Sequence, residues 1–171
     1  PILILIFSIS LNSIFISFGN INYSNDTQIL NEVNEEVKTQ NGFTLLENAK
    51  EVRDWLARQK VTRKITKLQV HHMDLPNYNT WKKTDKKLFD EPHFGRTQSL
   101  NSYGKSTWGS GASDGHGHYI AQHFNVFPDG KITTGRNLNS TPIGIRGWNT
   151  NAICIEIYGC FDKGKDTMTK E

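Results

Sequence analysis

The chain has 171 residues, of which 36% are hydrophobic and 22% are charged, and its formal net charge at neutral pH is +3. This length and composition are typical of one soluble globular domain that is large enough to bury a core of its own. The small excess of 20 basic over 17 acidic residues argues against a dedicated nucleic-acid binder, whereas a polyanionic surface such as a cell wall is compatible with it.

Residues 1–19 form an apolar stretch, interrupted by Ser and Asn, that is about the size of a signal-peptide core. The stretch has no initiator Met and no basic start, so we expect a sequence cut at its beginning. A buried core strand or helix is the alternative. Because a polar segment follows, we favour the remnant of a signal peptide or an uncleaved membrane anchor.

Residues 20–42 are rich in Asn, Gln, Glu, Ser and Thr, a composition that buries too little apolar surface to order itself. We predict a disordered linker there and a folded domain over residues 43–171.

The folded part is expected to begin with an amphipathic helix over residues 43–60, because its apolar residues recur at spacings of three and four. A strand over 65–71 follows. Residues 74–117 contain many glycines and two tryptophans, which indicates a long loop region with room for one short helix. Such long loops commonly shape binding sites.

A hairpin is predicted from a strand over 119–127, a turn at Pro128-Asp129-Gly130 and a returning strand over 131–135. A further strand over 152–158 makes at least four. The two cysteines, Cys154 and Cys160, lie on this strand and its exit, too far apart in an extended chain for a disulfide without a sharp reversal, so we expect free thiols.

Polar side chains in two of these strands are the candidates for chemistry. Glu156 shares one strand face with Cys154, while the neighbouring isoleucines point to the other face. It is either a catalytic carboxylate or a glutamate hydrogen-bonded beneath a loop. His71 and His72 end their strand on opposite faces, so only one can join a given site; His71 is either a zinc ligand or a hydrogen-bonded core residue.

Other histidines give weaker signals. His116 and His118 have the spacing of a metal pair in a Gly-rich loop, where simple exposure is the alternative, and His123 is expected to pack in its strand. The sequence contains no GxSxG, HExxH or paired CxxC motif, and the glycines of residues 109–115 lack the spacing of a dinucleotide site.

Three stretches together resemble a known family. They are Val70-His71-His72, residues 120–136 (IAQHFNVFPDGKITTGR) and residues 147–162 (GWNTNAICIEIYGCFD). In this order they resemble the zinc-dependent N-acetylmuramoyl-L-alanine amidases of the type-2 amidase and peptidoglycan-recognition-protein superfamily, in a form like those of Gram-positive bacteria or their prophages. The resemblance runs from about Phe43 to the end of the sequence.

The resemblance implies an α/β fold, in which a central mixed sheet is flanked by helices, and a Zn²⁺ cofactor. It matches His71 to the first zinc ligand. The family's second and third ligands, a His and then a Cys or Asp, would fall beyond residue 171. We therefore expect a sequence cut at its end as well, and inactive as it stands.

The resemblance also assigns the remaining site residues. Glu156 matches a glutamate with acid/base work in some members, whereas Gln122 stands where many relatives have a catalytic Tyr and cannot take that role. The substrate groove would include His72, Gln122, Trp148 and Asn149. The tryptophans of the long loop, Trp81 and Trp108, either line this groove or anchor the loop in the core.

The implied activity is hydrolysis of the amide between N-acetylmuramic acid and L-alanine of peptidoglycan, by a secreted or wall-associated monomer with no nucleic-acid partner. Membrane contact would come only through residues 1–19. The alternative is a module that binds peptidoglycan without cutting it. A more remote one is a structural wall domain with inert histidines.

Overall fold

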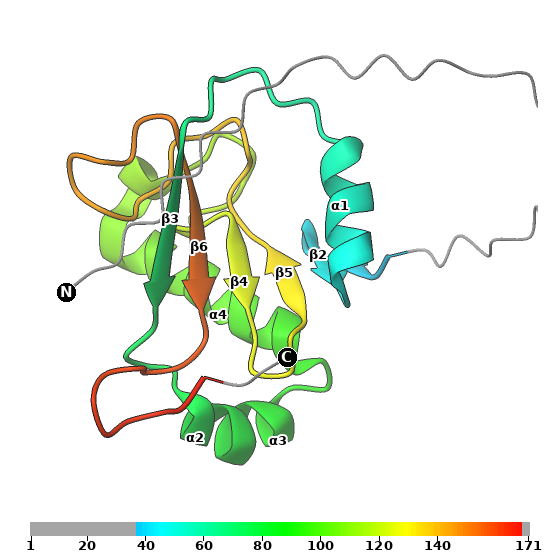
Figure 1. Cartoon of the computed structure of the whole chain (residues 1–171), viewed down its shortest axis with the longest axis vertical. Helices are drawn as coiled ribbons and strands as arrows, with labels where there is room; N and C mark the ends of the chain where they lie inside the picture. Colours follow the sequence, from blue (N-terminus) through cyan, green and yellow to red (C-terminus); the bar gives the residue numbers. More distant parts are fainter. Residues whose placement is uncertain (1–36, 169–171) are drawn as a thin grey trace, which may run out of the picture. The chain divides into compact units, whose positions relative to one another are not determined.

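The computed structural model describes residues 37–168, which form one compact unit. Residues 1–36, and with them the expected signal or anchor and most of the expected linker, lie outside the described residues. The elements in chain order (Figure 1) are β1 (Thr39–Gln40), β2 (Phe43–Leu46), α1 (Ala49–Ala57), β3 (Lys67–His72), α2 (Tyr78–Thr80), the π-helix η1 (Trp81–Asp85), α3 (Lys86–Leu88), α4 (Pro92–Trp108), the 3₁₀-helix η2 (Gly109–Ala112), β4 (Phe124–Val126), β5 (Ile132–Thr134) and β6 (Ala152–Ile157).

The strands form one mixed sheet in the order β1-β2-β5-β4-β6-β3. β6 pairs in parallel with both β3 and β4, and the remaining pairs are antiparallel. The general α/β class that the sequence predicts is therefore confirmed. β3 is an edge strand, and among the strands of residues 37–168 β6 is its only neighbour in the sheet.

The two longer helices cover opposite faces of the sheet. The Thr97 hydroxyl of α4 lies 2.7 Å from that of Thr133, whereas Trp55 of α1 meets Phe124 edge to face with 5.8 Å between ring centroids. Phe124 is paired with Thr134, the neighbour of Thr133, so the two contacts are on different faces. Figure 1 shows α4 behind the strands. Among residues 37–168 no helix is both long and apolar enough to cross a bilayer.

The core consists of two clusters of buried side chains, and Leu100 of α4 packs against both. One contains Phe43, Leu45, Phe94 and Ile120, and the other contains Met73, Trp81, Phe127 and Tyr158. Trp81 is only 2% exposed. It is a core anchor, which is the second of the two interpretations that the sequence allows for it.

The expected helix over 43–60 is wrong at its start, because residues 43–46 form strand β2. Asn41 and Gly42 both have positive φ angles, 53° and 81°, which suits the tight turn between β1 and β2. The helix begins only after Asn48, whose side chain accepts a hydrogen bond from Glu51 N at 3.0 Å and caps α1. Strand β1 precedes the expected start of the domain.

The expected loop over 74–117 is also wrong, since most of it is helical and α4 alone has 17 residues. Two of the glycines that indicate a loop are points of close packing within α4. A Cβ on Gly95 would lie 2.2 Å from the Phe89 ring, and one on Gly104 would lie 2.1 Å from the Tyr119 carbonyl oxygen. Glycine is needed at both places for proximity rather than for flexibility.

The strand expected over 119–127 is shorter, because only Phe124–Val126 pairs in the sheet. Asn101 of α4 takes up the preceding backbone: its Oδ1 accepts hydrogen bonds from Tyr119 N at 2.6 Å and Ile120 N at 3.1 Å. Side chains thus satisfy backbone groups that a longer ladder would otherwise pair. The strands over 65–71, 131–135 and 152–158 are present with bounds that differ by one or two residues.

Candidate active site at the ends of β3 and β6

The parallel pairing of β3 with β6 brings His71 and Glu156 together. They are direct register partners, as are Gln69 and Cys154, so these four side chains share one face of the sheet. The other face of the same pair carries Leu68, Val70 and the three isoleucines of β6. Glu156 therefore points away from the isoleucine layer, in agreement with the alternation of the sequence.

Glu156 is a half-buried carboxylate without a hydrogen-bond partner among residues 37–168. Burial raises its pKa to about 7, although the nearby His72 lowers it somewhat. A carboxyl group in this state holds a proton about half of the time at neutral pH. It can accept a proton or donate one, as an acid/base catalyst must.

Glu156 lines a hollow of about 290 Å³ between the end of β3 and the second half of α4. The lining residues are His72, Met73, Asp74, Leu75, Leu100, Tyr103, Trp108, Ala121, Gln122, Ile143 and Glu156. Tyr103 and Trp108 are 59% and 44% exposed, and their rings meet edge to face at 5.8 Å. A titratable carboxylate and two accessible aromatic faces thus share one hollow.

His71 has a buried ring nitrogen, Nε2, that makes no hydrogen bond in the described part of the chain. Burial, and to a lesser extent the charge of His72, lowers the pKa of His71, so the ring is neutral at pH 7. A Cβ on Gly144 would come within 3.3 Å of this nitrogen, so the loop after Ile143 passes close by. A neutral imidazole with an unpaired nitrogen fits the requirements of one metal ligand.

A complete metal site is not formed by residues 37–168, in which no three His, Cys, Asp or Glu side chains are grouped to hold an ion. Cys154 is buried beside His71 on the same face, and in the absence of a metal burial raises the pKa of its thiol to about 12. Both cysteines are free.

His72 lies at the rim of the hollow, on the face opposite His71. Its Nδ1 accepts a hydrogen bond from Phe161 N at 3.3 Å, and its Nε2 is 3.7 Å from Asp162 Oδ1. Gln122 is 4% exposed and donates from Nε2 to Asn125 Oδ1. His71, His72, Gln122 and Glu156 therefore all gather at one end of the sheet.

Trp148 and Asn149 are placed differently. Trp148 is 59% exposed and lies beside Lys67, whose Nζ is 5.3 Å from the ring centroid. Since Lys67 begins β3 and His71 is near its end, about 13 Å of strand separates the two places. Asn149 holds the loop above His71 instead, because its Oδ1 accepts from Gly144 N at 3.0 Å and from Gln69 Nε2 at 3.4 Å.

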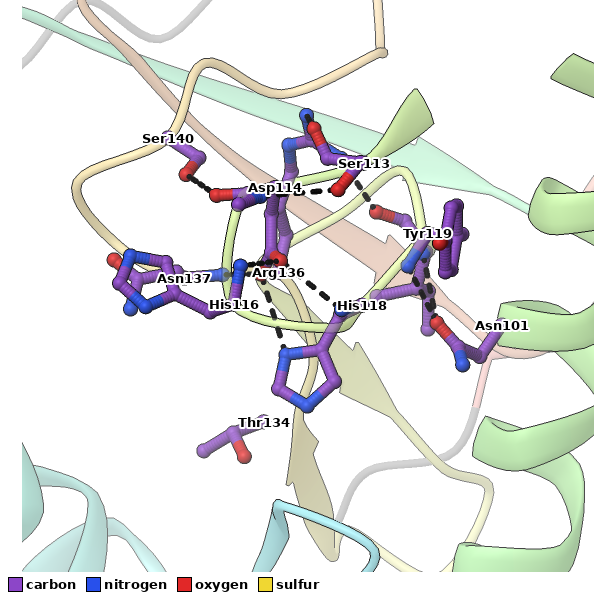
Figure 2. A network of polar contacts seen from close by, with 12 residues as sticks. Asn101, Ser113, Asp114, His116, His118, Tyr119, Thr134, Arg136, Asn137 and Ser140 are labelled. Carbon is purple, nitrogen blue, oxygen red and sulfur yellow. Dashed lines mark hydrogen bonds and ion pairs between the residues drawn. The ribbon is translucent and has the colours of Figure 1, made fainter. Parts of the chain in front are cut away.

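The remaining histidines have structural partners. Figure 2 shows His118 turned toward Asp114, which it meets through Nδ1 at 3.2 Å, while the ring of His116 lies away from it. The carboxylate of Asp114 also accepts from the backbone N–H of His116 and of Asn137 at 2.8 and 3.0 Å. These two histidines therefore belong to a loop-ordering network, not to a converging metal pair.

His123 packs, as the sequence predicts. It is fully buried, its Nδ1 accepts from Cys154 N at 3.0 Å, and burial together with nearby arginines lowers its pKa to about 4.

Tyr103 is a hollow-lining residue that the sequence does not single out. Trp108, whose ring packs against Tyr103, is already a groove candidate from the sequence, but the two rings meet only because both residues lie in the last turns of α4. The sequence feature that could have predicted this helix is Pro92 directly after Glu91, because proline is common at the first position of a helix.

Comparison of the chain with family models, with curated proteins and with solved structures finds no match.

Proposed function

We propose that the chain is a peptidoglycan hydrolase, a zinc-dependent N-acetylmuramoyl-L-alanine amidase that cleaves the amide between muramic acid and L-alanine of the stem peptide. The observation that carries the proposal is the state of Glu156: a half-buried carboxylate with a pKa of about 7 and no hydrogen-bond partner in the described residues, facing a hollow. Burying a carboxylate without a hydrogen-bond partner costs stability, and groups of this kind are concentrated at functional sites. The three motifs support the same assignment.

In this proposal Nε2 of His71 would be one ligand of zinc; residues 37–168 contain no group of three His, Cys, Asp or Glu side chains that completes the site. Zinc bound there would supply an activated water and would polarise the scissile carbonyl. The lowered pKa of His71 suits this role because the ring must be neutral to bind a metal.

Glu156 performs the proton transfers. In its ionised form it takes a proton from the attacking water, and the resulting acid then protonates the alanine nitrogen as the amide bond breaks. The pKa of about 7 belongs to the site without metal, and the positive charge of a zinc ion on His71 would lower it toward the ionised form that accepts the proton. Gln122, which cannot ionise, lies in the same hollow and offers only hydrogen bonds to the substrate.

Recognition of the sugar is assigned to the aromatic side of the hollow. Tyr103 and Trp108 present exposed ring faces on which a muramic acid ring can stack. His72, which lines the same hollow, would contact the peptide. Action on peptidoglycan requires export, so we propose a secreted or wall-associated protein, with residues 1–19 as signal or anchor.

The test is digestion of purified peptidoglycan, in the presence of zinc, by the protein with its full set of zinc ligands, with products identified by mass spectrometry. The expected products are glycan strands with a free lactyl carboxylate and peptides with a free N-terminal alanine. Glu156→Gln should lower the rate about 10²- to 10⁴-fold, the usual contribution of a general acid/base. Asp90→Asn, which removes an exposed carboxylate elsewhere, is the matched control and should keep full activity.

The second candidate function is peptidoglycan binding without cleavage, for which the exposed rings of Tyr103 and Trp108 in the hollow would suffice without a metal. It predicts that the protein with its full set of zinc ligands sediments with insoluble peptidoglycan and releases no peptide at any zinc concentration. Cleavage that is equally fast with Glu156→Gln would contradict the role of Glu156 in the amidase.

A further inference from the structure

Six exposed lysines lie on two neighbouring segments remote in sequence from each other. Residues 78–88, which comprise α2, η1 and α3, and the loop 159–168 are joined by a hydrogen bond of 3.0 Å from Tyr78 N to Asp166 Oδ2. Figure 1 draws this loop, in red, beside α2. The lysines, called here the lysine patch, are Lys82, Lys83, Lys86, Lys87, Lys163 and Lys165.

Positive charge is denser on these two segments than on the rest of the described structure. Residues 37–168 contain 19 Lys and Arg and 12 Asp and Glu, of which six and three lie in the two segments. The 21 residues of the segments therefore have a net charge of +3, whereas the other 111 residues together have +4. A concentrated positive surface attracts polyanions much more strongly than the same charge spread over a molecule.

The aspartates of the two segments do little to neutralise the patch. Asp85 is fully buried and binds Arg96 and the Tyr158 hydroxyl. Asp166 Oδ2 accepts from two backbone N–H groups, those of Tyr78 and Cys160, and Asp162 lies toward His72. No lysine of the patch forms an ion pair with another residue of 37–168; Lys86 alone has a partner, the ring of Trp81.

A hollow of about 480 Å³ lies where the two segments meet. Lys82 lines it from one segment and Lys165 from the other, with Tyr78, Asn79, Asp166 and Thr167 between them. It is separate from the hollow of Glu156, which none of these residues lines. The patch is therefore concave, with ammonium groups on two sides.

We propose that the lysine patch binds a linear phosphodiester polymer without bases, such as a poly(alditol phosphate) of a cell wall. Lysine ammonium groups on both sides of a hollow suit the spaced single charges of such a chain. Nucleic acid is disfavoured because Trp81 is buried and because Tyr78, the aromatic residue that lines the hollow, is half-buried with its ring packed edge to face on Phe161 at 5.8 Å. An anionic membrane is disfavoured because the helices here are short and broken, without the long apolar face of an interfacial helix.

The experiment measures binding of the full chain to poly(glycerol phosphate) at several salt concentrations. The variant Lys82→Gln/Lys165→Gln removes one ammonium group from each side of the hollow and should weaken binding about tenfold or more, with a smaller salt dependence. The control Lys60→Gln/Lys64→Gln removes the same charge from exposed positions elsewhere and should change affinity little. Urea unfolding of both variants verifies that they fold as the unmodified chain does.

Equal loss of affinity in the two variants, or none in either, would overturn the lysine patch as the binding surface. Equal or tighter binding of poly-glutamate, of duplex DNA or of phosphatidylglycerol vesicles would overturn the phosphodiester polymer as its ligand. In the protein with its full set of zinc ligands, the Lys82→Gln/Lys165→Gln variant should cleave small soluble muropeptides at the normal rate, because the hollow of Lys82 and Lys165 is separate from that of Glu156. This control separates the proposal from the amidase one.

Discussion

At the scale of single residues, the dominant feature is the free-energy cost of keeping Glu156 ionised in the folded protein. In the unfolded chain the carboxyl group has its ordinary pKa of 4.5, and in the folded chain its pKa is about 7. Between these values the folded state retains a proton that the unfolded state has lost. The contribution of Glu156 to stability is therefore fully present below pH 4.5 and is lost as the pH rises to 7.

The effect of Glu156→Gln on stability should therefore be more favourable at pH 8 than at pH 5, since the amide stays neutral at both. We expect the difference in the free energy of unfolding between variant and unmodified protein to shift in favour of the variant by about 1–3 kcal/mol from pH 5 to pH 8. Urea unfolding of both proteins at the two pH values measures it, and Asp90→Asn should show no such pH dependence. A difference between Glu156→Gln and the unmodified chain that is equal at both pH values would mean that the carboxyl group is not desolvated.

The sequence predicts part of this site, for a simple reason. Alternation along a strand determines which face a side chain occupies, so the order of residues alone assigns His71 and Glu156 to faces of their strands. Alternation does not reveal whether a side chain finds a hydrogen-bond partner. Among residues 37–168 neither Glu156 nor His71 Nε2 has one, and this depends on how loops from other parts of the chain pack around them. The distance of Trp148 from His71 cannot be predicted from the sequence for the same reason.

At the scale of elements, α4 is the helix on which the hollow depends, since it contributes Leu100, Tyr103 and Trp108. It is also the element that sequence patterns fail to predict. Its buried residues are His93, Phe94, Thr97, Asn101 and Gly104, of which only Phe94 is large and apolar, so its inward face is not a continuous stripe of large apolar residues. A helix of this kind has no clear hydrophobic periodicity to detect.

Gly104→Ala provides the test of this packing. Alanine is the better helix former, by about 1 kcal/mol in an exposed position. Here its Cβ would lie 2.1 Å from the Tyr119 carbonyl oxygen, a backbone atom that cannot swing aside. We expect a net loss of about 1–3 kcal/mol in the free energy of unfolding.

The control for Gly104→Ala is Ser102→Ala, at an exposed position of the same helix, which should be neutral or slightly stabilising. Chemical denaturation compares the two. Stabilisation by Gly104→Ala would show that α4 does not approach residue 119 closely.

At the scale of the whole molecule, one buried histidine links the start of α4 to the sheet. His93 is 5% exposed; its Nδ1 lies 2.6 Å from Glu91 Oε1 and its Nε2 lies 2.9 Å from Asp129 Oδ2 in the turn between β4 and β5. Burial lowers the pKa of His93, but hydrogen bonds and charges of Asp129 and Glu91 raise it more, so its pKa is above 6.5. The protonated ring is thus favoured in the folded state.

Because the folded pKa of His93 is raised, the stability that it contributes is fully present below pH 6.5 and declines as the pH rises through the folded value. His93→Gln should destabilise the protein by about 3 kcal/mol at pH 6 and by less at pH 9. Thermal and urea unfolding at both pH values measure this difference. A penalty that grows with pH would contradict a protonated His93.

The parallel pairing of β3 with β6 has a consequence for how the protein folds. α4 and the β4–β5 hairpin all lie between these two strands in the sequence, so their pairing closes one of the longest loops of the domain. Contacts of this range are slow to form, because the entropy of closing the loop must be lost before they stabilise anything. His71 and Glu156 meet only through that pairing, and a chain that has already formed its helices would still lack the candidate site.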